Sequence, residues 1–95
     1  MKQAIWNDQI IAESDDIVLI DGMYYFPKDT VKMQFLANSE HKTICHWKGE
    51  ASYYHAHANG KINNNAAFEY KTPCELASSI KDRIAFWKGI KIIDI

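Results

Sequence analysis

Residues 43–70 read TICHWKGEASYYHAHANGKINNNAAFEY, and in them short apolar, β-branched or aromatic blocks are separated by turn dipeptides. The dipeptides are Lys48-Gly49 and Asn59-Gly60. Short apolar blocks bounded by Gly and Asn favour strands over helices. We therefore predict a central β meander, with strands at Thr43 to Trp47, Ala51 to Ala58 and Ala66 to Tyr70.

Two hairpins are predicted before this meander. Their strands are expected at Ala4 to Trp6 with Gln9 to Glu13, and at Ile17 to Ile20 with Met23 to Phe26. Their turns are Asn7-Asp8 and Asp21-Gly22. Asp-Gly is a strong signal for a two-residue hairpin turn, because Gly accepts positive φ.

Two short helices are predicted between the strands. Asp29 can cap a helix from Thr30 to about Ala37, which has apolar residues four apart on one face. Thr72 and Glu75 form a capping box that predicts a helix from Pro73 to about Ile80.

Two last strands, Ile84 to Trp87 and Ile90 to Ile93, flank the tight-turn dipeptide Lys88-Gly89. Asn63-Asn64-Asn65 is expected to form an exposed loop. The length of 95 residues fits one domain. We therefore predict that residues 1–95 form a single domain of the mainly β (α+β) class, with a small antiparallel sheet and two short helices.

The composition narrows the classes of partner. Hydrophobic residues make up 47% of the chain, enough for one core without disulfides or a structural metal. Eleven Lys and Arg against twelve Asp and Glu give a net charge of −1, so no basic field attracts polyanions. We therefore expect no nucleic-acid partner and no membrane partner, and either a monomer or a homodimer.

The cytoplasm is the expected location. Residues Met1 to Asp8 carry no apolar signal-peptide core, and no apolar run approaches the roughly 18 residues that span a bilayer. Cys45 and Cys74 are the only cysteines, and we expect reduced packing residues rather than a disulfide.

The densest group of chemically versatile side chains lies in residues 43–54. Trp47, Tyr53 and Tyr54 either fill a small core or line a pocket for a small organic ligand. Lys48, which is followed by a glycine, is either a solvated lysine or an anchor for a ligand carboxylate or phosphate.

An enzyme acting in the same cleft is the main alternative. Cys45 could be a nucleophile, although the neighbouring His46 points to the opposite face of a regular strand. Glu13 and Glu69 are candidates for an acid and a base. A third alternative is a protein-interaction module that docks through strand edges or aromatic patches.

No cofactor and no metal are expected. His55 and His57 lie two apart, which places two imidazoles on one strand face. No Cys-x-x-Cys or His-Glu-x-x-His pattern supplies further ligands. The sequence also lacks a glycine-rich phosphate loop, a dinucleotide-binding fingerprint and a Gly-x-Ser-x-Gly elbow.

An ordered set of residues nearly spans the chain. It comprises Trp6-Asn7, Ile11-Ala12-Glu13-Ser14, Asp21-Gly22, Tyr25-Phe26-Pro27, Asp29, Leu36, Ser39, Thr43, Cys45, Trp47-Lys48-Gly49, Ala51, Tyr53-Tyr54, Ala66-Ala67, Tyr70, Pro73, Ala77, Ile80 and Ala85-Phe86. Its most specific part is Cys-x-Trp-Lys-Gly-x-Ala-x-Tyr, which begins at Cys45. By these residues the sequence resembles the family called domain of unknown function 427 (DUF427), also labelled nucleotidyltransferase-like family 9.

The resemblance implies a small antiparallel β fold similar to the β-tent group, with a pocket lined by the shared aromatics and lysine. Relatives of that fold often hold zinc through two Cys-x-x-Cys pairs, which this sequence lacks, so a loss of zinc is implied. The nucleotidyltransferase label implies a cluster of acidic metal ligands behind a Gly-Ser turn. This sequence has neither feature. The chain departs from the family pattern at His46, where a proline usually stands, and at Phe68, where a tryptophan usually stands.

Our leading hypothesis is a domain that binds a small organic ligand, without a metal, in an aromatic pocket around Trp47-Lys48-Gly49. Lys48 would be the polar anchor of this pocket. The predicted ligand-binding residues are Tyr25, Phe26, Cys45, Trp47, Lys48, Tyr53, Tyr54 and Phe68.

Overall fold

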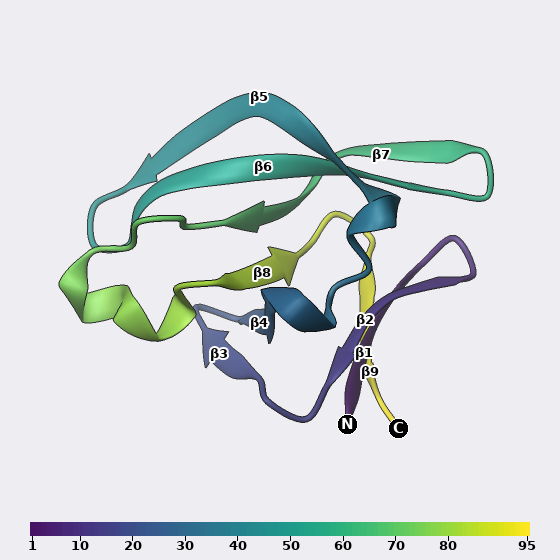
Figure 1. The fold of residues 1–95 in the computed structure, drawn as a ribbon, viewed down its shortest axis with the longest axis horizontal. Helices are drawn as coiled ribbons and strands as arrows, with labels where there is room; N and C mark the ends of the chain where they lie inside the picture. Colours follow the sequence, from purple (N-terminus) through teal and green to yellow (C-terminus); the bar gives the residue numbers. More distant parts are fainter.

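The structure is a computed structural model that describes residues 1–95, and its nine strands form two antiparallel sheets (Figure 1). The strands are β1 (Lys2–Trp6), β2 (Gln9–Ser14), β3 (Val18–Ile20), β4 (Met23–Pro27), β5 (Leu36–Cys45), β6 (Gly49–Ala58), β7 (Lys61–Glu69), β8 (Arg83–Phe86) and β9 (Lys91–Asp94). A three-stranded sheet has the order β2-β1-β9, and a six-stranded sheet has the order β3-β4-β8-β7-β6-β5. The predicted mainly β class is therefore confirmed.

Both N-terminal hairpins are confirmed. β1 pairs with β2, and β3 pairs with β4. Asn7 and Asp8 in the first turn have φ of 48° and 64°, and Asp21 and Gly22 in the second have φ of 51° and 78°. Two successive positive φ angles match the right-handed twist of the flanking strands, which explains why these dipeptides make the turns.

The central meander β5-β6-β7 is confirmed, with longer strands than predicted. β5 begins at Leu36 and β7 begins at Lys61. The expected loop Asn63-Asn64-Asn65 is wrong, because these residues lie inside β7. The pairing of β6 with β7 changes register around Asn65, whose φ is 55°, so asparagine here serves a bulge within the strand.

The predicted helix from Thr30 to Ala37 is wrong. The segment forms two single turns of 3₁₀ helix, η1 (Lys28–Thr30) and η2 (Met33–Phe35). Between them, Val31 makes a β bridge to Ala12, which holds the chain extended against β2. Tertiary pairing with β2 therefore overrides the local helical pattern.

The predicted helix from Pro73 to Ile80 forms only as 3₁₀ turns, η3 (Glu75–Ile80). Cys74 is the N-cap residue and makes no side-chain cap hydrogen bond. At Ala77, φ of −114° and ψ of 21° interrupt the helical geometry. The helical turns of this chain are all short, and none is long and apolar enough to cross a membrane.

The last two strands form near their predicted positions but join different sheets. β8 pairs with β4 and β7, whereas β9 pairs with β1. Lys88 and Gly89, with φ of 52° and 86°, make the turn between them. This turn therefore carries the chain from one sheet to the other.

The hydrophobic core has two parts, one on each face of the six-stranded sheet. The inner cluster lies between the two sheets and includes Phe26 and Tyr54 from the larger sheet and Ile11 from the smaller. The outer cluster includes Tyr25 from β4 and Ile80 from η3. Because successive side chains of a strand point to opposite faces, Tyr25 and Phe26 belong to different clusters.

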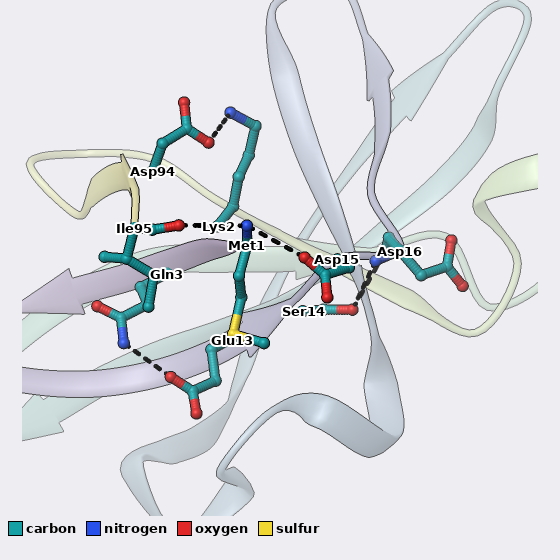
Figure 2. A network of polar contacts seen from close by, with 9 residues as sticks. All are labelled: Met1, Lys2, Gln3, Glu13, Ser14, Asp15, Asp16, Asp94 and Ile95. Atoms are coloured by element: carbon teal, nitrogen blue, oxygen red, sulfur yellow. Dashed lines mark hydrogen bonds and ion pairs between the residues drawn. The ribbon is translucent and has the colours of Figure 1, made fainter.

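The two ends of the chain lie side by side in the three-stranded sheet (Figure 2). Lys2 Nζ donates a hydrogen bond of 2.7 Å to Asp94 Oδ1, which joins β1 to β9. The α-ammonium of Met1 pairs with the Asp15 carboxylate at 3.1 Å, just beyond β2. Polar contacts at this end of the smaller sheet thus join β1 to β9, and join Met1 to the residue that follows β2.

Candidate functional site

A row of side chains crosses four neighbouring strands on the outer face of the six-stranded sheet. Tyr25 of β4 lies opposite Ala85 of β8, Ala85 lies opposite Phe68 of β7, and Phe68 lies opposite Tyr53 of β6. Directly opposite residues in antiparallel strands point to the same face. The ring centroid of Phe68 lies 6.1 Å from that of Tyr25 and 5.6 Å from that of Tyr53, so the rings are in contact.

A hollow of about 230 Å³ lies on this row. Its lining residues are Asp21, Met23, Lys48, Tyr53, Phe68, Tyr70 and Trp87. Tyr70 and Trp87 meet Phe68 edge-on, at centroid distances of 6.2 and 6.1 Å. The hollow therefore has aromatic walls around Phe68 and a charged group on its rim.

That charged group is the ammonium of Lys48, whose side chain is only 10% exposed. It pairs with the carboxylate of Asp21 at 2.8 Å, and the Asp21 side chain is 59% exposed. The same ammonium lies 5.3 Å from the ring centroid of Trp47 and 5.9 Å from that of Tyr70. A nearly buried cation is thus balanced by two rings and by one carboxylate from an exposed hairpin turn.

The backbone around Gly49 holds Lys48 in place. Gly49 has φ of 109°, and a Cβ there would lie 3.3 Å from the carbonyl oxygen of Thr72. The Cys74 N–H donates a 2.9 Å hydrogen bond to the Lys48 carbonyl. Glycine therefore lets the segment before η3 approach the β5–β6 turn closely, and this contact positions the lysine.

The Tyr25 hydroxyl is fully buried and has no hydrogen-bond partner. Burial raises the pKa of this phenol well above its ordinary value, and the charges of Tyr70 and Asp21 raise it further. Burial also raises the pKa of Tyr70. Since nearly all buried polar groups in proteins are paired, an orphaned hydroxyl close to residues of the hollow requires an explanation.

The structure separates the residues predicted to bind ligand. Lys48, Tyr53 and Phe68 line the hollow, and Tyr25 packs against Phe68 beside it. Trp47 stacks on Lys48 without lining the hollow. Three further predicted residues lie elsewhere: Cys45 packs against the outer cluster, and Phe26 and Tyr54 belong to the inner cluster.

Strand alternation explains this separation. Tyr53 and Tyr54 are consecutive in β6, so only one of them can face the hollow. The same holds for Tyr25 and Phe26 in β4. The Tyr54 hydroxyl instead donates a hydrogen bond to a carboxylate on the inner face.

That carboxylate belongs to Glu69, which is 2% exposed. Lys28 Nζ also donates to it, at 3.0 Å, and this hydrogen bond raises the pKa of Lys28. Burial, followed by the hydrogen bond to Glu69, raises the pKa of Tyr54. Glu13 lies in the other sheet and accepts a 2.7 Å hydrogen bond from Gln3 (Figure 2), so the two glutamates have separate partners.

Cys45, the candidate nucleophile, and His55 and His57, considered as a pair of metal ligands, have separate surroundings. No hydrogen bond joins Cys45 to His46 or to another base, although Cys45 is partly buried beside the outer cluster. His55 Nδ1 accepts a 3.1 Å hydrogen bond from the Asn65 N–H, so this nitrogen is already engaged. His57 lies in the wall of a different hollow.

Two larger hollows exist outside the outer cluster. One, of about 440 Å³, lies between η2 and the tip of the β6–β7 hairpin and includes Phe35 and Ile62 in its wall. The other, of about 540 Å³, is lined by Pro27, Lys28, Asp29 and Asp82 and has no hydrophobic residue in its wall. A fourth hollow, also of about 230 Å³, has Trp6 as its one aromatic lining residue. We favour the hollow over Phe68 as the candidate site, because it alone combines several rings with a nearly buried charge.

Four residues of the hollow were missed by the sequence reasoning: Asp21, Met23, Tyr70 and Trp87. Period-two alternation could have found two of them, since Met23 is two residues from Tyr25 and Tyr70 is two from Phe68. Trp87 lies just beyond β8, and its neighbour two residues back, Ala85, was not a predicted ligand-binding residue, so alternation would not have identified it. Asp21 was assigned only a turn role, and no local signal connects it to Lys48.

The comparisons with known proteins concern the whole chain. No curated protein matches this sequence. A family model described as domain of unknown function (DUF427), NTP_transf_9, matches residues 2–94. The match covers both sheets and the whole candidate site. The chain therefore belongs to the DUF427 family.

Proposed function

We propose that this domain binds a small organic ligand in the hollow on the outer face of the six-stranded sheet. The observation that carries the proposal is the nearly buried ammonium of Lys48 on the rim of an aromatic-walled hollow. A charged group is costly to bury, and this one lies beside a hollow that a ligand could fill. Rings of Tyr53, Phe68 and Trp87 would supply the contact area, and Lys48 would orient the ligand.

The size of the hollow limits the ligand. Its volume of about 230 Å³ is below the roughly 300–1,000 Å³ of sites for drug-sized molecules. A molecule with one aromatic ring and a short polar substituent therefore fits the proposal better than a nucleotide.

Two tryptophans of nearly equal exposure provide a matched test. Trp87 lines the hollow and is 36% exposed, whereas Trp47 lies outside it and is 37% exposed. We expect benzyl alcohol, a neutral single-ring probe, to produce saturable amide shifts at Phe68 and Tyr70 in nuclear magnetic resonance titrations. Trp87→Leu should weaken this binding by about tenfold, while Trp47→Leu, which removes a ring from Lys48 but none from the hollow, should weaken it less.

Thermal unfolding of both variants is the control for folding. Equal effects of the two substitutions would contradict the proposal, because the position of the ring relative to the hollow would then be irrelevant. Shifts that saturate only at the tip of the β6–β7 hairpin would also contradict it, since they would assign binding to the larger hollow there.

We further propose that the fold is of the β-tent type and that the domain acts in the cytoplasm as a monomer or homodimer. Two antiparallel sheets support the first point, and two free cysteines support the second. Superposition on a zinc-containing β-tent domain tests the fold type, and light scattering at two concentrations tests self-association. A sheet order unlike that of β-tent domains would contradict the assignment.

A further inference from the structure

We infer that the ligand is a single-ring aromatic acid whose carboxylate replaces Asp21 on the ammonium of Lys48, an inference that rests on the proposed function. Asp21 then serves as an internal substitute for the ligand's anionic group. Three features support this: the asymmetry of the ion pair, an unpaired hydrogen-bond donor beside the hollow, and the sign of the charge that the hollow accepts.

The ion pair is asymmetric. Lys48 is 10% exposed and held by the backbone contact to Cys74, whereas Asp21 is 59% exposed on the turn of the β3–β4 hairpin. Removing Asp21 from the pair returns a carboxylate to water at little cost, while the ammonium cannot leave. A ligand carboxylate can therefore take the place of Asp21 without leaving a buried cation unpaired.

The buried Tyr25 hydroxyl is an unpaired donor beside the hollow. It has no partner in the structure, and the Tyr25 ring packs edge-on against Phe68, a lining residue of the hollow, with 6.1 Å between the ring centroids. Burial raises the pKa of this phenol, so the hydroxyl stays protonated at neutral pH. An ammonium and a protonated hydroxyl are both donors, and a carboxylate is an acceptor with two oxygens.

Cationic ligands are the competing class, because aromatic walls and a carboxylate also suit an ammonium group. In this hollow, however, the cation position is already filled by Lys48, which lies over the rings of Trp47 and Tyr70. A second cation would meet the like charge of Lys48 at close range. The charge distribution therefore favours an anion.

Three probes of equal ring size test the sign of the charge: benzoate, benzyl alcohol and benzylammonium. Each is titrated into the full chain at neutral pH while the indole N–H of Trp87, which donates to the Asn65 carbonyl, is followed by nuclear magnetic resonance. We expect benzoate to bind about tenfold more tightly than benzyl alcohol, and benzylammonium to bind most weakly.

Substitutions on the ion pair then test the replacement of Asp21. Asp21→Asn removes the competing carboxylate and should tighten benzoate binding by about two- to fivefold, with no change for benzyl alcohol. Lys48→Met should reduce the affinity for benzoate to that for benzyl alcohol. Matched controls are Asp15→Asn, another exposed and paired carboxylate, and Lys88→Met, whose ammonium lies over Trp87 outside the hollow. Neither control substitution should change the preference for benzoate over benzyl alcohol.

Tyr25→Phe tests the unpaired donor. It should weaken benzoate binding by about threefold or more while leaving benzyl alcohol unchanged.

The outcomes separate the two proposals. Binding of benzyl alcohol at the hollow without a preference for benzoate overturns the inference and leaves the proposed function standing. Weaker benzoate binding by Asp21→Asn also overturns the inference, because Asp21 would then help the ligand rather than compete with it. Failure of all three probes to give saturable shifts at the hollow overturns the proposed function itself.

Discussion

The two faces of the six-stranded sheet are formed by the same strands but are covered differently. The inner face is covered by the three-stranded sheet and packs Phe26 and Tyr54 into a continuous core. The outer face is covered partly by η3, and beside this cover a hollow remains over Phe68. The inner face thus packs into a core, whereas the outer face keeps a hollow lined by several rings.

Polar groups follow the same division. On the inner face, the Tyr54 hydroxyl donates to the buried Glu69 carboxylate, which also accepts from Lys28. On the outer face, the Tyr25 hydroxyl has no partner, and Lys48 relies on an exposed carboxylate. The inner face is therefore satisfied within the chain, whereas the outer face has unused hydrogen-bonding capacity.

The largest effect on stability is expected when an aromatic ring is removed from one face or the other. Phe26→Ala should lower the free energy of unfolding by about 3–5 kcal/mol, because the closed inner cluster cannot fill the space. Phe68→Ala should cost less, since its ring already borders a hollow. Chemical denaturation of both variants measures the difference. Equal losses would mean that the two faces are packed alike.

A smaller loss of stability is expected from substituting Gly49, which is next to Lys48 at the start of β6. Gly49→Ala combines a positive φ with a crowded Cβ and should cost about 1–3 kcal/mol. Gly60→Ala is the matched control, because Gly60 has φ of 80° and nothing within 4 Å of its added Cβ. Denaturation midpoints should fall further for Gly49→Ala, and a larger fall for Gly60→Ala would argue against close packing around the lysine.

Alkaline pH should weaken the fold through Tyr25. Its pKa is raised by burial above the unfolded value of 10.0, so above this pH the unfolded chain loses the phenolic proton first. Stability is thus fully present below about pH 10 and falls by up to about 1.4 kcal/mol per pH unit as the pH rises towards the folded pKa. Tyr25→Phe should reduce the slope of stability against pH, and an unchanged slope would contradict burial of the hydroxyl.

The smallest effect is expected when a single hydroxyl is removed from each face at neutral pH. Tyr25→Phe should leave stability unchanged or raise it by up to about 1 kcal/mol, because an unpaired buried hydroxyl is lost. Tyr54→Phe should lower stability by about 1–2 kcal/mol, because Glu69 loses a donor. Thermal unfolding compares them directly, and a loss at Tyr25 as large as that at Tyr54 would reveal a missing partner for Tyr25.

Local patterns were enough to predict most of the strands. Asn7-Asp8 and Asp21-Gly22 make the predicted turns because their positive φ angles are a local property. The helix expected after Asp29 failed because the bridge between Val31 and Ala12 is a contact between distant segments. No local pattern contains that contact.

The candidate site was predicted only in part, for a similar reason. Lys48, Tyr53 and Phe68 were identified from their residue types, and they do line one hollow. The burial of Lys48 depends on Asp21, which belongs to a different hairpin, so it could not be predicted from the neighbouring sequence. Strand alternation, in contrast, was available and would have excluded one residue of each adjacent aromatic pair.

Intermolecular nuclear Overhauser effects from the ring protons of benzoate test the central claim most directly. We predict contacts to the ring protons of Tyr53, Phe68 and Tyr70 on the outer face. Contacts only to Phe35 and Ile62, in the larger hollow at the hairpin tip, would contradict the account, as would the absence of any contact at saturating benzoate.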